Sequence, residues 1–197
     1  MSGGDLPVAP VMATPVVDPA GLAEPFADLW VAVTRAGGAV GFAPDAPEAD
    51  IRALAASTLD EVAQGRLHML ALPGDPADGT PEPAERSSLL GCVFLQPGAG
   101  PVVAHRATVL RLMVDPRHQG GGLGARLLAG CAELARDLGF DQLLLSARGG
   151  TGLPEFYRHL GWTEVGRFPR ALRVGPGDVR DEHWFQQELR DAAGAPG

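Results

Sequence analysis

The chain has 197 residues, 45% of them hydrophobic, and a net charge of −8. This length and composition predict a single globular domain over residues 11–190, with a disordered amino terminus at 1–10 and a flexible tail at 191–197. The negative charge argues against nucleic acid or an anionic membrane as a partner and suits a cationic amine better. The amino terminus has no basic region and no apolar stretch long enough for a signal or a membrane span, so we expect a cytoplasmic protein.

The spacing of apolar residues predicts the secondary structure of the first half of the chain. Apolar side chains at helical spacing follow Asp18, which we expect to cap the first helix, and a second helix is expected to start at Pro47. A stretch rich in proline, aspartate and glycine at 73–86 indicates a surface loop. The expected elements are a short strand at 11–17, helices at 18–37 and 47–65, and strands at 67–72 and 89–96.

The second half of the chain alternates strands and helices. The expected elements are a strand at 106–114, a helix at 123–138, a strand at 142–146, a short helix at 153–160, and a hairpin of strands at 162–173 and 183–189. Together with the first half, this order predicts an α/β protein with a mixed sheet and helices on both faces.

The cysteines and histidines of the sequence do not indicate a metal site. Cys92 lies in a strand-like run, and Cys131 lies on the apolar face of the helix at 123–138. Both are expected to be small buried hydrophobic residues, not a disulfide pair. The histidines lack the spacing that is typical of metal ligands, so we expect no metal.

A glycine-rich stretch between the strand at 106–114 and the following helix is the main functional signal. Asp115-Pro116 ends the strand, because proline fixes its own φ angle and disfavours helix at the preceding residue. Gly120 to Gly122 and Gly124 follow and lead into the helix. Such a turn presents unpaired N–H groups and the positive end of the helix dipole. It therefore indicates a binding site for a phosphorylated ligand.

Two phosphate-binding motifs fit these glycines. Gly120, Gly122 and Ala125 have the G-x-G-x-x-A spacing of dinucleotide-binding proteins, but that motif follows its strand directly, whereas residues 115–119 intervene here. A loop that depends on a lysine is excluded, because the chain contains no lysine. The alternative motif is Q-x-x-G-x-G at 119–124, placed after a strand that ends in V-D-P.

A second motif makes this interpretation specific. The segment FYRHLGW, residues 156–162, lies one strand and one helix after the glycines. Together, the two motifs resemble those of the GNAT superfamily of N-acetyltransferases, over about residues 15–189. The resemblance implies the GNAT fold, with a mixed, mostly antiparallel sheet of about seven strands and helices on both faces. It also implies acetyl-CoA as co-substrate and suggests a homodimer.

Further segments resemble the branch of small-molecule acetyltransferases that includes the tabtoxin-resistance protein. These segments are HRATVLRLMVDP, LLLSAR, FYRHLGWTEVGRFP and WFQQEL. The branch carries a glutamate and an aspartate where this chain has Thr108 and Ser146. Those carboxylates are proposed to handle the substrate amine, so the resemblance supplies no general base here. Thr108 and Ser146 become candidate contacts to the substrate.

The resemblance also implies roles for residues around an acetyl-CoA site. Backbone groups of Leu112, Met113 and Val114 would pair with the pantetheine arm, and one N–H group would polarise the thioester carbonyl. Tyr157 would act as general acid toward the departing thiolate. His105 is the leading candidate for the base, because the pKa of histidine lies near neutrality. The N–H groups expected to bind the pyrophosphate belong to Gln119, Gly120, Gly121, Gly122, Leu123, Gly124 and Ala125.

These observations predict an enzyme that transfers acetyl from acetyl-CoA directly to an amine in a ternary complex. The favoured acceptor is a small molecule, such as an antibiotic or toxin amine in self-resistance. Acetylation of a protein or peptide amino terminus is the alternative reaction. A non-catalytic acyl-CoA-binding module is the alternative class, motivated by the two missing carboxylates. The sequence leaves the acceptor and the length of the acyl chain open.

Overall fold

A computed structural model describes residues 13–74 and 88–189 of the chain. The expectations for 1–10, for 191–197 and for most of the loop at 73–86 lie outside these residues. The elements, besides the short 3-10 turns η2 (Pro101–Val103) and η3 (Pro116–His118), are β1 (Thr14–Pro15), α1 (Ala23–Arg35), α2 (Glu48–Ala63), β2 (His68–Pro73), β3 (Leu89–Pro97), β4 (Arg106–Val114), α3 (Leu123–Asp137), β5 (Gln142–Arg148), α4 (Leu153–His159), β6 (Thr163–Gly175) and β7 (Asp178–Glu188).

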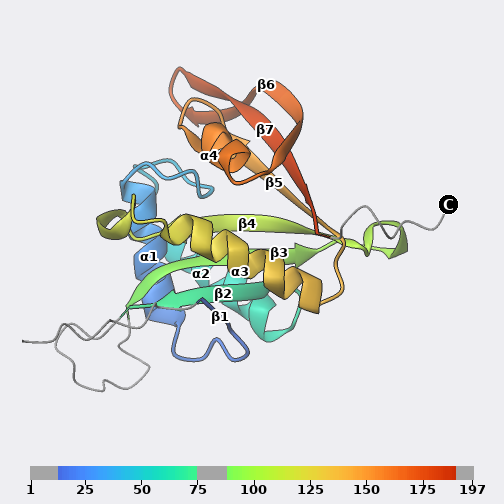
Figure 1. Ribbon diagram of the computed structural model, residues 1–197. Coiled ribbons are helices and arrows are strands. Elements are labelled where there is room, and N and C mark those ends of the chain that lie inside the picture. The colour runs from blue at the N-terminus through green and yellow to red at the C-terminus, as the bar shows by residue number, and fades with distance from the viewer. Residues whose placement is uncertain (1–12, 75–87, 190–197) are drawn as a thin grey trace, which may run out of the picture.

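The described strands form one seven-stranded sheet in the order β1-β2-β3-β4-β5-β7-β6. Within it, β4 and β5 run parallel, and the other neighbours run antiparallel. Helices α1 and α2 cover one face of the sheet, and α3 and α4 cover the other (Figure 1). The predicted α/β class, the mixed and mostly antiparallel sheet and the order of elements are therefore confirmed.

Each face of the sheet has its own hydrophobic core, because successive side chains of a strand point to opposite faces. In β2, Leu70 and Leu72 belong to the core under α3, whereas Met69 and Ala71 belong to the core under α1 and α2. The continuous apolar run of β2 is thus explained by burial on both sides.

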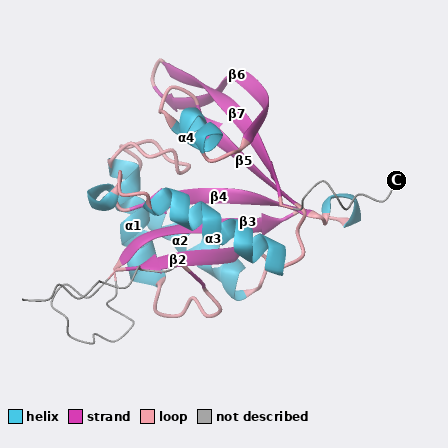
Figure 2. Cartoon of the chain, viewed as in Figure 1, coloured by secondary structure: helices cyan, strands magenta, loops and turns pink. Residues whose placement is uncertain are grey.

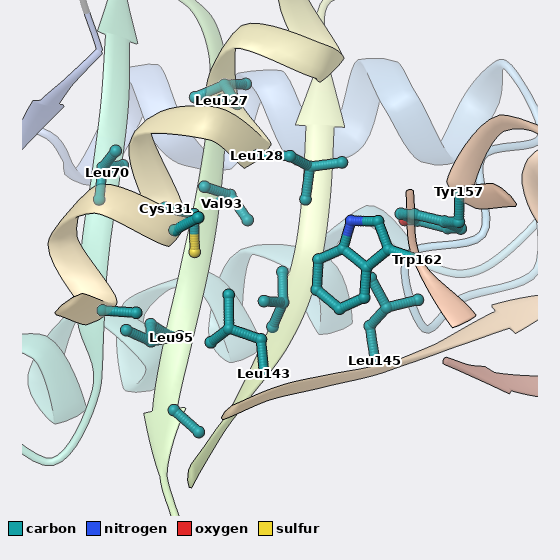
Figure 3. Packing of buried hydrophobic residues seen from close by; sticks show 14 of the residues in the cluster. Leu70, Val93, Leu95, Leu127, Leu128, Cys131, Leu143, Leu145, Tyr157 and Trp162 are labelled. Carbon is teal, nitrogen blue, oxygen red and sulfur yellow. The ribbon is translucent and has the colours of Figure 1, made fainter. Parts of the chain in front are cut away.

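Helix α3 brings the glycine stretch to the sheet. Leu127, Leu128 and Cys131 project from α3 toward the strands beneath it (Figure 3). Cys92 lies in the core on the opposite face, so the two cysteines are buried and free, as expected. Burial raises the pKa of both thiols, that of Cys131 to about 12.

The first elements begin later than the sequence predicted. Strand β1 is confined to Thr14–Pro15 among the described residues, and α1 starts at Ala23. Asp18 does not cap the helix, because its carboxylate accepts the N–H of Ala20, 2.9 Å away, in the preceding turn. Gly21 then adopts a φ of 84°, which is incompatible with a helix running through it.

Two further details differ in the second half of the chain. Strand β7 begins at Asp178 and not at His183, because the hairpin pairs from Gly175 and Asp178 onward. Leu138, the last residue of the helix expected at 123–138, is the C-cap of α3 and is 42% exposed.

The sheet splits between β4 and β5, which pair only through residues 106–108 and 142–144. The distortion lies in β4, where Arg111 and Leu112 together oppose the single residue Val93 of β3 and Arg111 has a φ of 50°. Such a bulge bends a strand and increases its twist. Strands β5, β6 and β7 with α4 therefore lean away from the rest of the sheet (Figure 2).

Candidate active site

A cavity of about 610 Å³ lies where β4 and β5 diverge. Its walls come from the turn after α1, the bulged part of β4, the glycine stretch with the start of α3, the end of β5, and α4. The cavity reaches both faces of the sheet. Val40 and Arg111 line it on the side of α1, and Gly124 and Tyr157 line it on the side of α3.

The glycine stretch forms the wall at the start of α3. Gly122 is the N-cap with a φ of 80°, and Gly120 has a φ of 83°, conformations that favour glycine. The first hydrogen bond of the helix runs from the Arg126 N–H to the Gly122 carbonyl, over 3.1 Å. The N–H groups of residues 123–125 precede this bond, so the helix offers them no acceptor. All the expected pyrophosphate contacts except Gly121 line the cavity.

One hydrogen bond joins the end of β4 to the glycine stretch. The side-chain amide of Gln119 donates to the Val114 carbonyl, 3.1 Å away. The backbone N–H of Asp115 donates to the Leu90 carbonyl at the start of β3, 2.8 Å away. Along an antiparallel strand, the backbone N–H and C=O groups of successive residues point alternately toward the paired strand and away from it. The backbone of Met113 therefore faces β3, whereas that of Val114 faces the open side. Leu112 and Val114 line the cavity, and the Met113 side chain is fully buried.

Tyr157 projects from α4 into the wall of the cavity. Its ring contacts those of Phe156, Trp162 and Phe185, with centroids 5.3, 6.1 and 5.7 Å away, which holds the phenol in one orientation. Tyr157 and Trp162 lie side by side in Figure 3. The residue is 6% exposed, and burial raises the pKa of its phenol to about 12. The hydroxyl therefore stays protonated and available as a hydrogen-bond donor at any physiological pH.

The structure separates the other sequence-predicted candidates. His105 is exposed before the start of β4, where its carbonyl accepts the N–H of Asp141, 2.7 Å away. Thr108 pairs with Leu144 where β4 and β5 are still joined. Neither residue lines the cavity, whereas Ser146 does. Of the proposed base and substrate contacts, the structure thus brings only Ser146 to the site.

Sequence reasoning missed the turn after α1, which forms the opposite wall. The sequence indicated only that the first helix ends near residue 37. A Cβ atom on Gly38 would lie 2.5 Å from Cγ1 of Val33, so this tight turn requires glycine. The Trp30 indole N–H donates to the Val40 carbonyl over 3.0 Å and anchors the far side of the turn.

Sequence reasoning also missed two arginines in the cavity. Arg111 lies over the ring of Trp30, with Cζ 4.9 Å from the ring centroid. Arg148 ends β5, and both arginines are half-buried and line the cavity. Burial lowers the pKa of each guanidinium, although both remain charged because the normal pKa of arginine is so high. For Arg111 the available signal was a charge that interrupts the apolar run of residues 109–114, whereas Arg148 lies beyond the strand expected at 142–146 and gave no such signal.

The described residues show no group of three or more histidine, cysteine, aspartate or glutamate side chains that is able to hold a metal ion. Within the same ranges, no helix has the length and apolar character needed to cross a membrane.

Residues 84–164 match the sequence model of the acetyltransferase (GNAT) domain. This range contains both motifs and most of the residues that line the cavity, so the sequence over this stretch is similar to that of a GNAT acetyltransferase domain. No curated protein matches the chain at a significant level.

Solved structures with the same fold cover almost the whole chain. Ribosomal-protein-alanine N-acetyltransferase from Brucella melitensis has a TM-score of 0.66 and 15% identity, over 90% of this chain and 99% of its own. A Salmonella typhimurium protein assigned as an acetyltransferase was solved with its cofactor acetyl-CoA. It has a TM-score of 0.66 and 15% identity, over 94% of this chain and 98% of its own. A protein assigned as a phosphinothricin N-acetyltransferase has a TM-score of 0.66 and 18% identity, over 91% of this chain and 99% of its own. These likenesses show that the chain has the GNAT fold.

Proposed function

We propose that this GNAT-fold acyltransferase moves an acetyl group from acetyl-CoA directly to the amine of a small molecule. The observation that carries the proposal is the convergence of three features on one cavity. Unpaired N–H groups at the start of α3, the open edge of β4 and the Tyr157 phenol all line it. Each feature suits a different part of a nucleotide thioester.

The start of α3 suits the pyrophosphate of acetyl-CoA. N–H groups of residues 123–125 have no helical acceptor, and the positive end of the helix dipole favours an anion there. A Cβ atom built on Gly120 or Gly122 would meet nothing within 4 Å, so these glycines leave open space beside the N–H groups. Residues Gln119 to Ala125 would therefore bind the two phosphates through the backbone.

The split between β4 and β5 suits the pantetheine arm. The Val114 backbone faces this split, so β4 can hydrogen-bond the amides of an extended ligand as it would bond a neighbouring strand. The same edge would supply the N–H that polarises the thioester carbonyl and stabilises the charge that develops on its oxygen.

Tyr157 would stabilise the thiolate that leaves when the amine attacks. A thiol has a pKa of about 8.5, so full proton transfer from a phenol with a pKa of about 12 is unfavourable. The phenol would instead donate a hydrogen bond to the sulfur, which takes its proton from the attacking nitrogen. An amine that arrives unprotonated then needs no dedicated base, consistent with the position of His105 outside the cavity.

The nature of the acceptor and the role in resistance stay predictions. An antibiotic or toxin amine is favoured by the sequence resemblance to small-molecule acetyltransferases. The fold shared with a protein assigned as a phosphinothricin N-acetyltransferase supports the same choice without establishing it. The homodimer and the cytoplasmic location are likewise predictions.

A thiol-release assay tests the proposal. The protein is offered acetyl-CoA with a panel of amines, amino acids and peptides, and free CoA is measured with an aromatic disulfide reagent. Cys92 and Cys131 are buried, so native protein contributes little to the signal. We expect turnover with small amines and amino acids and little with peptides. Stabilisation by CoA without turnover of any acceptor would favour a non-catalytic acyl-CoA-binding module.

A further inference from the structure

The charge of the cavity differs in sign from that of the whole chain. The chain carries 24 acidic and 16 basic residues. Among the described residues that line the cavity, however, the charged side chains are Arg111 and Arg148, with His118 beside the glycine stretch and no aspartate or glutamate. The ligand in this cavity therefore meets a positive environment that the net charge of −8 did not predict.

The structure holds Arg111 as a ligand-binding group would be held. Its backbone is fixed by the bulge of β4, and its guanidinium lies against the Trp30 ring. Trp30 is fully buried and hydrogen-bonded to Val40, so the ring is a rigid support. Among the described residues, Arg111 forms no ion pair with an acid. The carboxylate of Glu61, on α2, interacts with Arg111 only electrostatically, without forming an ion pair.

Arg148 contributes positive charge from the opposite wall. It ends β5, on the same strand face as Ser146, because alternate residues share a face. Its neighbours are Asp178 and Arg180, which are hydrogen-bonded to each other, and Glu182, which pairs with it on the adjacent strand β7. Among the described residues, no acid forms an ion pair with Arg148, so its charge remains available.

The position of Arg111 separates it from the expected phosphate site. Arg111 packs on α1, on one face of the sheet, whereas the glycines and Tyr157 lie on the face of α3 and α4. The Arg111 side of the cavity is therefore where an acceptor would approach the thioester. A guanidinium supported by an aromatic ring binds a carboxylate in a planar, bidentate manner.

We propose that the acceptor is an amino acid or a similar zwitterion, whose carboxylate is bound by Arg111 and attracted by Arg148. This inference rests on the proposed acetyl transfer and specifies its substrate class. A bound carboxylate would fix one end of a small acceptor and leave its amine free to reach the thioester. The turn after α1 would enclose the side chain.

A matched pair of acceptors tests the inference. The thiol-release assay compares amino acids with their primary amides, which keep the amine and lack the negative charge. We expect kcat/KM to be at least about tenfold higher for the acids, the usual effect of a hydrogen bond to a charged group. The amine of the amide is less basic, so a larger fraction of it is unprotonated at neutral pH. Amine reactivity alone therefore favours the amide, and it does not explain a higher kcat/KM for the acid. An aminophosphonate shows whether the site requires a carboxylate or accepts another oxyanion.

Variants then identify the residues responsible. Arg111→Gln and Arg148→Gln should each raise KM for the acids, Arg111→Gln by about tenfold or more, and leave KM for acetyl-CoA unchanged. Arg111→Lys keeps the charge but not the planar group, so its KM for the acids should lie between those of the parent protein and Arg111→Gln. Arg66→Gln is the control, because Arg66 is exposed on the turn before β2 and lies outside the cavity. Melting temperatures identify a variant that does not fold. If one of the two glutamine variants fails to fold, the variant of the other arginine tests the inference.

The outcomes are distinguishable. Equal use of acids and amides by the parent protein would overturn the carboxylate inference and leave acetyl transfer intact. An increase in KM for acetyl-CoA in the arginine variants would assign these side chains to the phosphates of CoA and also overturn the inference. Absence of thiol release with every acceptor would overturn the proposed function and the inference together.

Discussion

The side-chain amide of Gln119 donates a hydrogen bond to the Val114 carbonyl, 3.1 Å away, and so ties the open end of β4 to the glycine stretch. The two walls that would bind pantetheine and pyrophosphate are thereby held at a fixed separation. A ligand that contacts both walls benefits from this arrangement, because the walls are already ordered before it binds.

Gln119→Ala is expected to weaken CoA binding by about fivefold, the usual value for one neutral hydrogen bond. Isothermal titration calorimetry with CoA measures the effect. Gln142→Ala is the control, because the Gln142 amide also donates an exposed hydrogen bond, to the Glu188 carboxylate over 2.8 Å, at the closed end of β5 and away from the cavity. Equal losses of affinity in the two variants would show that the Gln119 bond has no specific role in the site.

Gly122→Asp and Gly122→Asn together test the placement of the pyrophosphate. Gly122 has a φ of 80°, which asparagine and aspartate tolerate better than other side chains. The two variants have nearly the same shape and differ in charge. We expect the aspartate to reduce CoA affinity at least about tenfold more than the asparagine, because it repels phosphate at the helix N-terminus. Similar affinities for the two variants, measured at low salt, would place the pyrophosphate elsewhere.

Tyr157→Phe is expected to lower kcat by about a hundredfold and to leave the affinity for CoA within about twofold, since it removes a donor that acts in the transition state. Phenylalanine retains the ring contacts with Phe156, Trp162 and Phe185, so the melting temperature should change little. Burial raises the pKa of Tyr157 to about 12, and the phenol is protonated below that value. The rate should therefore rise with pH as the acceptor amine loses its proton, with no fall from Tyr157 ionisation below about pH 11. An unchanged kcat in Tyr157→Phe would remove the phenol from the mechanism.

The sequence predicts those parts of the fold that depend on local pattern. The strand at 106–114 ends where Asp115-Pro116 predicts, and α2 begins one residue after Pro47. Glycines that need a positive φ also marked the start of α3 correctly, because the cause is steric and lies within the residue itself.

The geometry of the cavity was not predictable in this way. The bulge requires two residues of β4 to oppose Val93 of β3, and this pairing is a property of the assembled sheet. His105 illustrates the consequence. Its position before the strand was predictable, but only the assembled sheet shows that this end of β4, where β4 and β5 are still paired, lies outside the cavity. Arg111 interrupted an apolar run in the sequence, and only the fold shows that it enters the cavity beside Trp30.

The acid stability of the protein should depend on Asp115. This nearly buried carboxylate accepts the backbone N–H of Arg117 at 2.9 Å and its guanidinium Nη2 at 2.6 Å, which orders the turn between β4 and the glycine stretch. The hydrogen bond from the Arg117 side chain lowers the pKa of Asp115 from its ordinary value of 3.8. Because the folded-state pKa is the lower one, the stabilisation is fully present above the ordinary value and is lost as the pH falls through the depressed one.

Asp115→Asn therefore should reduce the free energy of unfolding by about 1–2 kcal/mol near neutral pH, a range that allows for solvent screening around the exposed Arg117. The difference between parent and variant should shrink progressively once the pH falls below about 4, because the carboxylate is then protonated in the unfolded chain first and in the folded chain only at lower pH. Urea unfolding across this pH range measures it. Glu164 and Asp181 also have lowered pKa values, but they are common to parent and variant and cancel in the difference. A difference that stays constant down to about pH 2 would show that the charge of Asp115 does not contribute to stability.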